Sequence, residues 1–116
     1  NDVTVNTSSE MIYGRVFVDG YTTTDQDPNG IIAEIGYGMA GSDPYIDQLW
    51  VWTPATYDTA CADCADVDAY QYMGTVTPVA EGAYSVAFRF SPPLNGMAKG
   101  YYYVYGDTTL QFNCIP

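Results

Sequence analysis

The chain has 116 residues, which is enough for one domain with a modest hydrophobic core. Three Lys and Arg residues against 14 Asp and Glu residues give a net charge of −11, and there is no His. This charge argues against nucleic acid and anionic membranes as partners, because both need cationic patches, and it permits binding of calcium or of basic partners. The missing His removes Ser–His–Asp and Cys–His catalysis and His-based zinc sites.

Other sequence features also argue against an enzyme and against a membrane span. No motif pairs a nucleophile with a base, so we expect a protein without catalytic activity. No apolar run approaches the roughly 20 residues of a transmembrane helix. The chain starts at Asn1 without Met and without a signal peptide, which favours a mature secreted chain or a fragment.

Short runs of β-branched and aromatic residues alternate with clusters of Gly, Pro, Asp and Asn, and helical periodicity is hard to find. The predicted strands are Val3–Asn6, Met11–Asp19, Ile31–Gly38, Leu49–Thr53, Tyr70–Thr77, Ala83–Phe90, Tyr101–Tyr105 and Thr109–Asn113. Seven to eight short strands separated by turns predict an all-β fold, an antiparallel β-sandwich of the immunoglobulin-like kind.

The first ten residues, "NDVTVNTSSE", form a polar extension before the sandwich domain of residues 11–116. Val3 and Val5 share one face if the segment is extended. The segment is then either the edge strand of its own sandwich or a donor strand that completes the sheet of a neighbouring chain, through backbone hydrogen bonds and alternate side chains.

The next strand, "MIYGRVFV", has apolar residues on both faces. Tyr13 and Phe17 lie on the face opposite to that of Val16. A strand with one face in solvent would carry polar residues on that face instead. Such surplus apolar residues predict a surface covered by a ligand, by a loop or by another subunit.

The turn "DQDPNG" matches the first half of a calcium-binding loop. Asp25, Asp27 and Asn29 have the spacing of the first three ligands, and Gly30 would supply the sharp turn. The twelfth position, however, is Gly36 rather than an acid, and the same residues are good turn formers on their own. Calcium is thus the one cofactor that the sequence proposes, and the turn alone is the competing interpretation.

In "LWVW", Trp50 and Trp52 lie on one face if the segment is a strand. Aromatic rings of this kind serve as sugar-stacking platforms, which predicts polysaccharide as a partner. The alternative is that one or both rings fill the sandwich core.

Cys61, Cys64 and Cys114 are an odd set of cysteines, which in a secreted protein favours disulfides. The Cys-x-x-Cys spacing resembles a redox motif, but no βαβ pattern surrounds it. We expect Cys114 to pair with Cys61 or Cys64 and to fix the last strand to the long loop. The remaining cysteine would then link chains or stay a buried thiol.

The last strands contrast with each other. "AYSVAFRFS" alternates cleanly, whereas "GYYYVYGD" places Tyr101 and Tyr103 on one face and further apolar residues on the other. We expect these two tyrosines to join Val3, Val5, Tyr13 and Phe17 in an assembly surface.

Segments across residues 13–107 resemble an accessory β-sandwich domain of secreted bacterial enzymes and lipoproteins. The stretches that carry this resemblance are "YGRVFVDGYTT", "IIAEIGYGMAGSDP", "LWVWTPATYD", "YQYMGTVTPVAEGAYSVAFRFS" and "YYYVYGD". The resemblance implies an immunoglobulin-like or carbohydrate-binding-module-like sandwich without a catalytic centre. The first ten residues and the Cys-containing loop depart from the pattern.

Two functions remain at this point. The first is a secreted, extracellular structural protein that polymerises with copies of itself into a filament or surface layer, by donation of the N-terminal strand. The second is a carbohydrate-binding module with the tryptophans as its platform.

Overall fold

The computed structural model describes residues 2–17, 31–67, 69–91 and 102–113, with the backbone alone for residues 2–4, 102–109 and 113. Within these residues it contains eight strands and one short 3-10 turn, η1. In chain order they are β1 (Asp2–Thr4), β2 (Ile12–Val16), β3 (Ile32–Met39), β4 (Val51–Pro54), β5 (Thr56–Tyr57), η1 (Ala65–Val67), β6 (Tyr70–Gly74), β7 (Gly82–Ser91) and β8 (Tyr102–Asn113).

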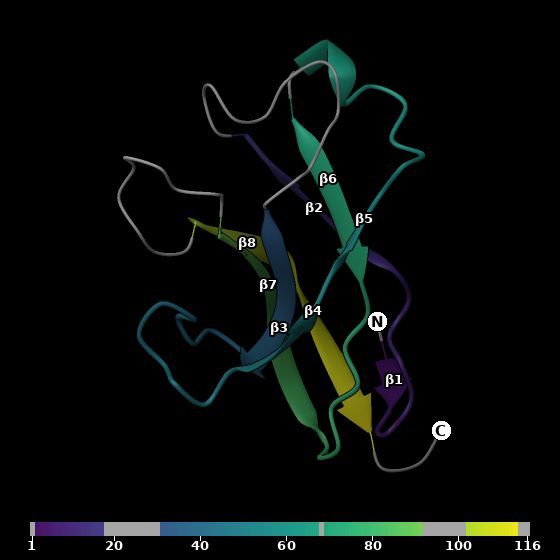
Figure 1. The fold of residues 1–116 in the computed structure, drawn as a ribbon. Coiled ribbons are helices and arrows are strands. Elements are labelled where there is room, and N and C mark those ends of the chain that lie inside the picture. Colours follow the sequence, from purple (N-terminus) through teal and green to yellow (C-terminus); the bar gives the residue numbers. More distant parts are fainter. Residues whose placement is uncertain (1, 18–30, 68, 92–101, 114–116) are drawn as a thin grey trace.

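The strands form two packed sheets, and the prediction of an antiparallel β-sandwich is confirmed (Figure 1). One sheet has the order β1-β8-β7-β3-β4 and the other β2-β6-β5. All pairs are antiparallel except β1 with β8. In the immunoglobulin naming of strands, β8-β7-β3-β4 corresponds to G-F-C-C′ and β2-β6-β5 to B-E-D.

The core lies between the sheets and follows the alternation of the strands. On β7, Val86, Phe88 and Phe90 point inward and are buried, as the pattern "AYSVAFRFS" predicts. Ile35 of β3 and Tyr70 of β6 face them from the same interior. The remaining buried members of this cluster are Val16, Ala33, Tyr72, Val76, Leu110 and Phe112.

β2 packs closely against β7 of the other sheet. A Cβ atom on Gly14 would overlap the ring of Phe88, so glycine lets the aromatic ring fill this space. Antibody domains join strands B and F by a disulfide. Here β2 and β7 occupy the corresponding places without a cysteine, and packing of Phe88 against Gly14 connects them instead.

Several predicted strand boundaries were wrong. The sequence pattern ended a strand at Tyr105 and began another at Thr109, whereas β8 runs through Gly106 and Asp107. The register between β7 and β8 shifts there, from Ala87 opposite Tyr105 to Ser85 opposite Thr109. The strand therefore continues past Gly106 and Asp107 through an irregularity in the pairing, such as a β-bulge provides. The two-residue strand β5 was not predicted, because two residues are too few to show the alternation of apolar and polar side chains that marks a strand.

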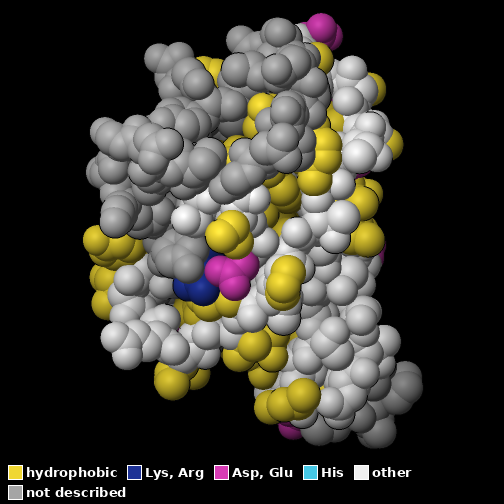
Figure 2. All heavy atoms as spheres, viewed as in Figure 1, with side chains coloured by type: hydrophobic (Ala, Val, Ile, Leu, Met, Phe, Trp, Pro, Cys, Tyr) yellow, Lys and Arg dark blue, Asp and Glu magenta, His cyan; other side chains and the backbone are white. Residues whose placement is uncertain are grey.

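Apolar side chains reach the surface over much of the molecule, as Figure 2 shows for one face. The largest exposed fractions belong to the loop between β3 and β4 and to the residues beside it: Leu49 is 85% exposed, Met39 74% and Ile46 73%. The described residues contain no helix that is long and apolar enough to cross a membrane.

Candidate functional site

The outer face of the five-stranded sheet carries two tryptophans. Trp50 and Trp52 lie on the same face, as predicted, with ring centroids 5.6 Å apart and planes inclined by 25°. Neither belongs to the core cluster between the sheets. Trp50 is only 6% exposed, but this ring is buried on the outer face, so the alternative that one or both rings fill the sandwich core is wrong.

Two glycines of β3 make room for these rings. A Cβ atom on Gly36 would overlap the Trp52 ring, and one on Gly38 would overlap the Trp50 ring. Since residues two apart on a strand share a face, the pair forms a bare strip on which the indoles lie. The spacing of the glycines in "IGYGMAG" is the sequence signal for this strip, and the strip was not predicted.

Polar contacts hold both rings in place. The Trp50 Nε1–H donates a hydrogen bond to Ser42 Oγ at 2.8 Å, and the Ser42 hydroxyl donates to the Met39 carbonyl at 2.6 Å. Arg89 lies 4.2 Å above the Trp52 ring, and its Nε donates to Glu34 Oε1 at 2.7 Å. The stacked pair is therefore a fixed part of the sheet surface and not a pair of free rings.

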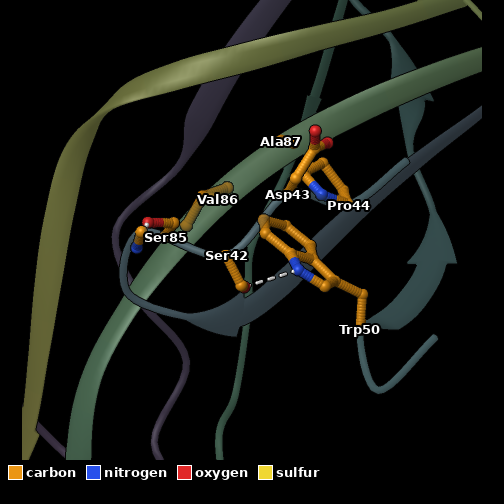
Figure 3. Close-up of a pocket in the computed structure, with 8 residues that line it drawn as sticks. Ser42, Asp43, Pro44, Trp50, Ser85, Val86 and Ala87 are labelled. Atoms are coloured by element: carbon orange, nitrogen blue, oxygen red, sulfur yellow. Dashed lines mark hydrogen bonds between the residues drawn. The ribbon is translucent and has the colours of Figure 1, made fainter. Parts of the chain in front are cut away.

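A pocket of about 320 Å³ opens beside Trp50, between the start of the β3–β4 loop and β7 (Figure 3). We call it the Trp50 pocket. Its lining residues are Gly41, Ser42, Asp43, Pro44, Trp50, Ser85, Val86 and Ala87. Loop and strand are joined by a hydrogen bond from the Gly41 amide to Ser85 Oγ at 3.0 Å. Ser42, Asp43 and Ser85 were not among the predicted site residues. Ser42 and Asp43 are also ordinary turn formers, and Ser85 fits the polar face of an alternating strand.

A second polar cluster lies where the β5–β6 loop meets β2. Arg15 donates to both carboxylate oxygens of Asp63, from Nη2 at 2.5 Å and from Nη1 at 3.2 Å. Its Nε donates to Gln71 Oε1 at 2.7 Å, and Gln71 in turn donates to Asp58. The hydrogen bond from Arg15 lowers the pKa of the Asp63 carboxyl. These contacts fix the loop to the edge of the three-stranded sheet.

The predicted disulfide pairing was wrong. Cys61 and Cys64 are bonded to each other, with Cα atoms 5.7 Å apart, so neither is left for Cys114. The reason is topological, because the loop carrying η1 and the end of β8 at Asn113 lie at opposite ends of the sandwich (Figure 1). Cys114 itself lies outside the described residues.

The loop also brings Cys61, Asp63 and Cys64 within 4.8 Å of one another. Two of these three groups are the sulfurs of a disulfide, and the third is the carboxylate paired with Arg15. The cluster is therefore unsuited to a metal ion. The proposed calcium ligands Asp25, Asp27 and Asn29 lie outside the described part of the chain.

The N-terminal segment lies on the edge of its own five-stranded sheet. β1 pairs in parallel with β8 through three positions, Asp2 with Gln111, Val3 with Phe112 and Thr4 with Asn113. Val5 packs against the core, and Asn6 turns the chain with φ at 62°.

After this turn the chain is held more firmly. The Ser9 amide donates to the Val76 carbonyl at 2.9 Å, and the Val76 amide donates back to Ser9 Oγ at 3.1 Å. In the single chain the segment is thus part of the sandwich from β1 onward, and donation to a neighbour stays a prediction.

The other predicted assembly residues are distributed over both sheets and the undescribed part of the chain, and their common surface stays a prediction. Tyr13 is 56% exposed and Phe17 61% exposed, and both belong to the β2 side of the sandwich. Tyr103 belongs to β8 in the opposite sheet, where it pairs with Arg89. Tyr101 lies outside the described residues.

No protein family model, curated protein or solved structure matches this chain.

Proposed function

We propose that this protein is a secreted, non-catalytic structural subunit that assembles with copies of itself by exchanging its N-terminal strand. The observation that carries the proposal is the attachment of β1, an edge strand held by only three register pairs to β8. An element exchanged between identical chains makes the same contacts in its new place, so exchange costs little in contact energy.

The position of the turn supports the proposal. Asn6 lies between the short strand β1 and the firmly bonded Ser9. Rotation within residues 6–8 would release residues 1–5, and it would put at risk two hydrogen bonds, from the Asn6 amide to the Pro78 carbonyl and between the Ser8 and Thr77 hydroxyls. Val3 and Val5 would then occupy, on the next chain, the places that they occupy on their own chain.

Exposed apolar area supplies a driving force for the exchange. Because the contacts of β1 are the same before and after exchange, polymerisation needs newly buried surface. Met11, Tyr13 and Phe17 follow the exchanged segment directly and are 46%, 56% and 61% exposed. Burying such side chains is worth about 25 cal/mol per Å² of apolar area. This burial has to outweigh the repulsion between chains of net charge −11, which added salt screens.

The disulfide supports the proposed location. The bond between Cys61 and Cys64 is typical of oxidising compartments, which include the extracellular space. Each chain would hold one exchangeable strand and one acceptor edge on β8, so that donation from chain to chain need not close and can extend into a filament.

The geometry gives less support to polysaccharide binding by Trp50 and Trp52. A sugar platform requires an open ring face, whereas Trp50 is 6% exposed and Arg89 lies over Trp52. We therefore keep polysaccharide as the weaker proposal.

The direct test compares the full chain with a deletion of residues 1–8, which removes β1 and the turn but keeps Ser9. Sedimentation velocity and negative-stain electron microscopy should show polymers of the full chain and folded monomers of the truncated chain. A synthetic peptide of residues 1–8, added in excess, should shorten the polymers by occupying the acceptor edge. The proposal fails if the truncated chain assembles as before, or if the full chain stays monomeric at high concentration and in calcium.

A further inference from the structure

The Trp50 pocket has the size of a site for a small ligand. Its volume is about 320 Å³. Sites for small molecules span about 300–1,000 Å³, so this pocket lies at the lower end of that range. It is built from two parts of the chain, the loop after β3 and the strand β7, and the hydrogen bond from Gly41 to Ser85 joins them.

The walls of the pocket are mostly apolar. Pro44 and Ala87 offer aliphatic surface, and Trp50 offers an indole (Figure 3).

The pocket also contains a negative charge. Asp43 lies on its rim, and Asp43 Oδ1 accepts a hydrogen bond from the Tyr45 amide at 2.9 Å. This bond fixes the side chain within the turn. The net charge of −11 adds a negative potential over the molecule that concentrates cations and repels anions.

We propose that the Trp50 pocket binds a small organic cation with a primary or quaternary ammonium group. The ammonium group pairs with the Asp43 carboxylate, and its alkyl groups contact the apolar wall that Trp50, Pro44 and Ala87 form. This site is independent of strand exchange, since none of its lining residues belongs to residues 1–8.

Two other ligand classes fit the pocket less well. A neutral sugar would have to stack on Trp50, but with 6% of its surface exposed the ring offers too little face. Calcium takes six to eight oxygen ligands, whereas the pocket contributes one carboxylate and two serine hydroxyls from its side chains. An organic cation needs only one opposite charge in the pocket and an apolar wall that its alkyl groups can contact.

The test is a titration of ¹⁵N-labelled full-length protein, followed by two-dimensional NMR. The probes are choline chloride, its neutral isostere 3,3-dimethylbutan-1-ol, and glucose. Choline should shift the Trp50 indole signal and the Ser42 and Ser85 amides saturably. The isostere should bind at least about tenfold more weakly, because it lacks the charge. Added salt should weaken choline binding by screening.

A matched pair of variants tests whether the carboxylate of Asp43 supplies the negative charge that binds choline. Asp47 lies in the same loop and accepts a hydrogen bond from the Leu49 amide at 2.9 Å, as Asp43 does from Tyr45, but it does not line the pocket. Asn can accept the same turn hydrogen bond through its side-chain oxygen. Asp43→Asn should therefore weaken choline binding about tenfold, while Asp47→Asn changes it less than about twofold.

Several results would overturn the proposal. They are equal binding of choline and its isostere, saturable binding of glucose without choline binding, equal losses in the two variants, and no saturable shift with choline at all. The amide signals outside residues 40–50 report whether each variant keeps the fold, so a loss of structure is distinguished from a loss of binding.

Discussion

The two glycines of β3 decide where the tryptophans lie. Gly36 and Gly38 leave a strip of bare backbone on the outer face, and the rings of Trp52 and Trp50 rest on it. Any side chain at either position has to displace an indole that a second residue also holds, Trp50 by Ser42 and Trp52 by Arg89.

The substitution Gly36→Ala should therefore destabilise the protein by about 1–3 kcal/mol, because the new methyl group overlaps the Trp52 ring. Urea unfolding of Gly36→Ala, Trp52→Ala and the double variant measures the coupling between the two positions. In the Trp52→Ala background most of the cost of Gly36→Ala should disappear. Equal costs in both backgrounds would show that the ring is not the obstacle.

Tyr72 carries a buried hydroxyl that has no hydrogen-bond partner among the described residues. Leaving such a group unsatisfied costs free energy, so Tyr72→Phe should raise the free energy of unfolding by about 1 kcal/mol. A loss of stability would instead reveal a partner for the hydroxyl.

The same residue predicts a dependence on pH. Burial raises the pKa of Tyr72 above its ordinary value of 10.0, so the folded state disfavours the ionised form. Stability that is fully present below pH 10 should therefore decline as the pH rises above 10, since the unfolded state releases its proton more readily. Tyr72→Phe should reduce this alkaline loss, as unfolding measured across pH 9–11 can show.

At the scale of elements, the disulfide belongs to one loop and not to the connection between loop and last strand. Because Cys61 and Cys64 close a short ring, replacing both by Ser should cost about 2 kcal/mol, the lower end for disulfides, and leave the sandwich folded. Peptide mapping without reduction should find the bond within the loop. It should also find one free thiol per unassembled chain, at Cys114. A peptide that joins Cys114 to the loop within one chain would contradict this arrangement.

Strands could be predicted from sequence where one face is wet and the other is buried. β7 shows this most clearly, since Val86, Phe88 and Phe90 alternate with Ser85 and Arg89. β8 was divided in two because Gly106 and Asp107 are turn formers, and only its pairing with β7 shows that the strand continues. Long-range pairing of this kind leaves no local pattern.

The candidate site shows the same limit. That Trp50 and Trp52 share a face follows from alternation alone. Their position over β3 depends on which strand neighbours β4, and that is a property of the sheet order. The Trp50 pocket depends in addition on the path of a loop, for which Ser42, Asp43 and Pro44 give only turn propensity.

At the scale of the whole molecule, the two ends of the described chain meet at one edge. β1 lies in parallel on β8, so the first and last strands pair although they are farthest apart in sequence. An edge strand of three residues is a weak closure for a sheet and leaves unpaired backbone groups at its border. The proposed assembly depends on this edge, because β1 must leave β8 of its own chain and pair with β8 of the next chain.

Disulfide trapping of β1 distinguishes exchange of this strand from its return to the same chain. Asp2 pairs with Gln111 in the register of β1 and β8, so Asp2→Cys and Gln111→Cys bring two thiols together. The Cys114→Ser background removes the third natural cysteine. Cys61 and Cys64 are already bonded to each other and do not interfere.

The products of oxidation should differ between unassembled and assembled chains. Mild oxidation of the unassembled double variant should give intramolecular bonds and chains that no longer polymerise. Oxidation after assembly should give a ladder of covalent multimers on a non-reducing gel, because the introduced thiol on β1 of each chain then faces the introduced thiol on β8 of the next chain. The single variant Asp2→Cys should give no ladder beyond dimers. Polymers that yield only internally bonded monomers after oxidation would contradict strand exchange.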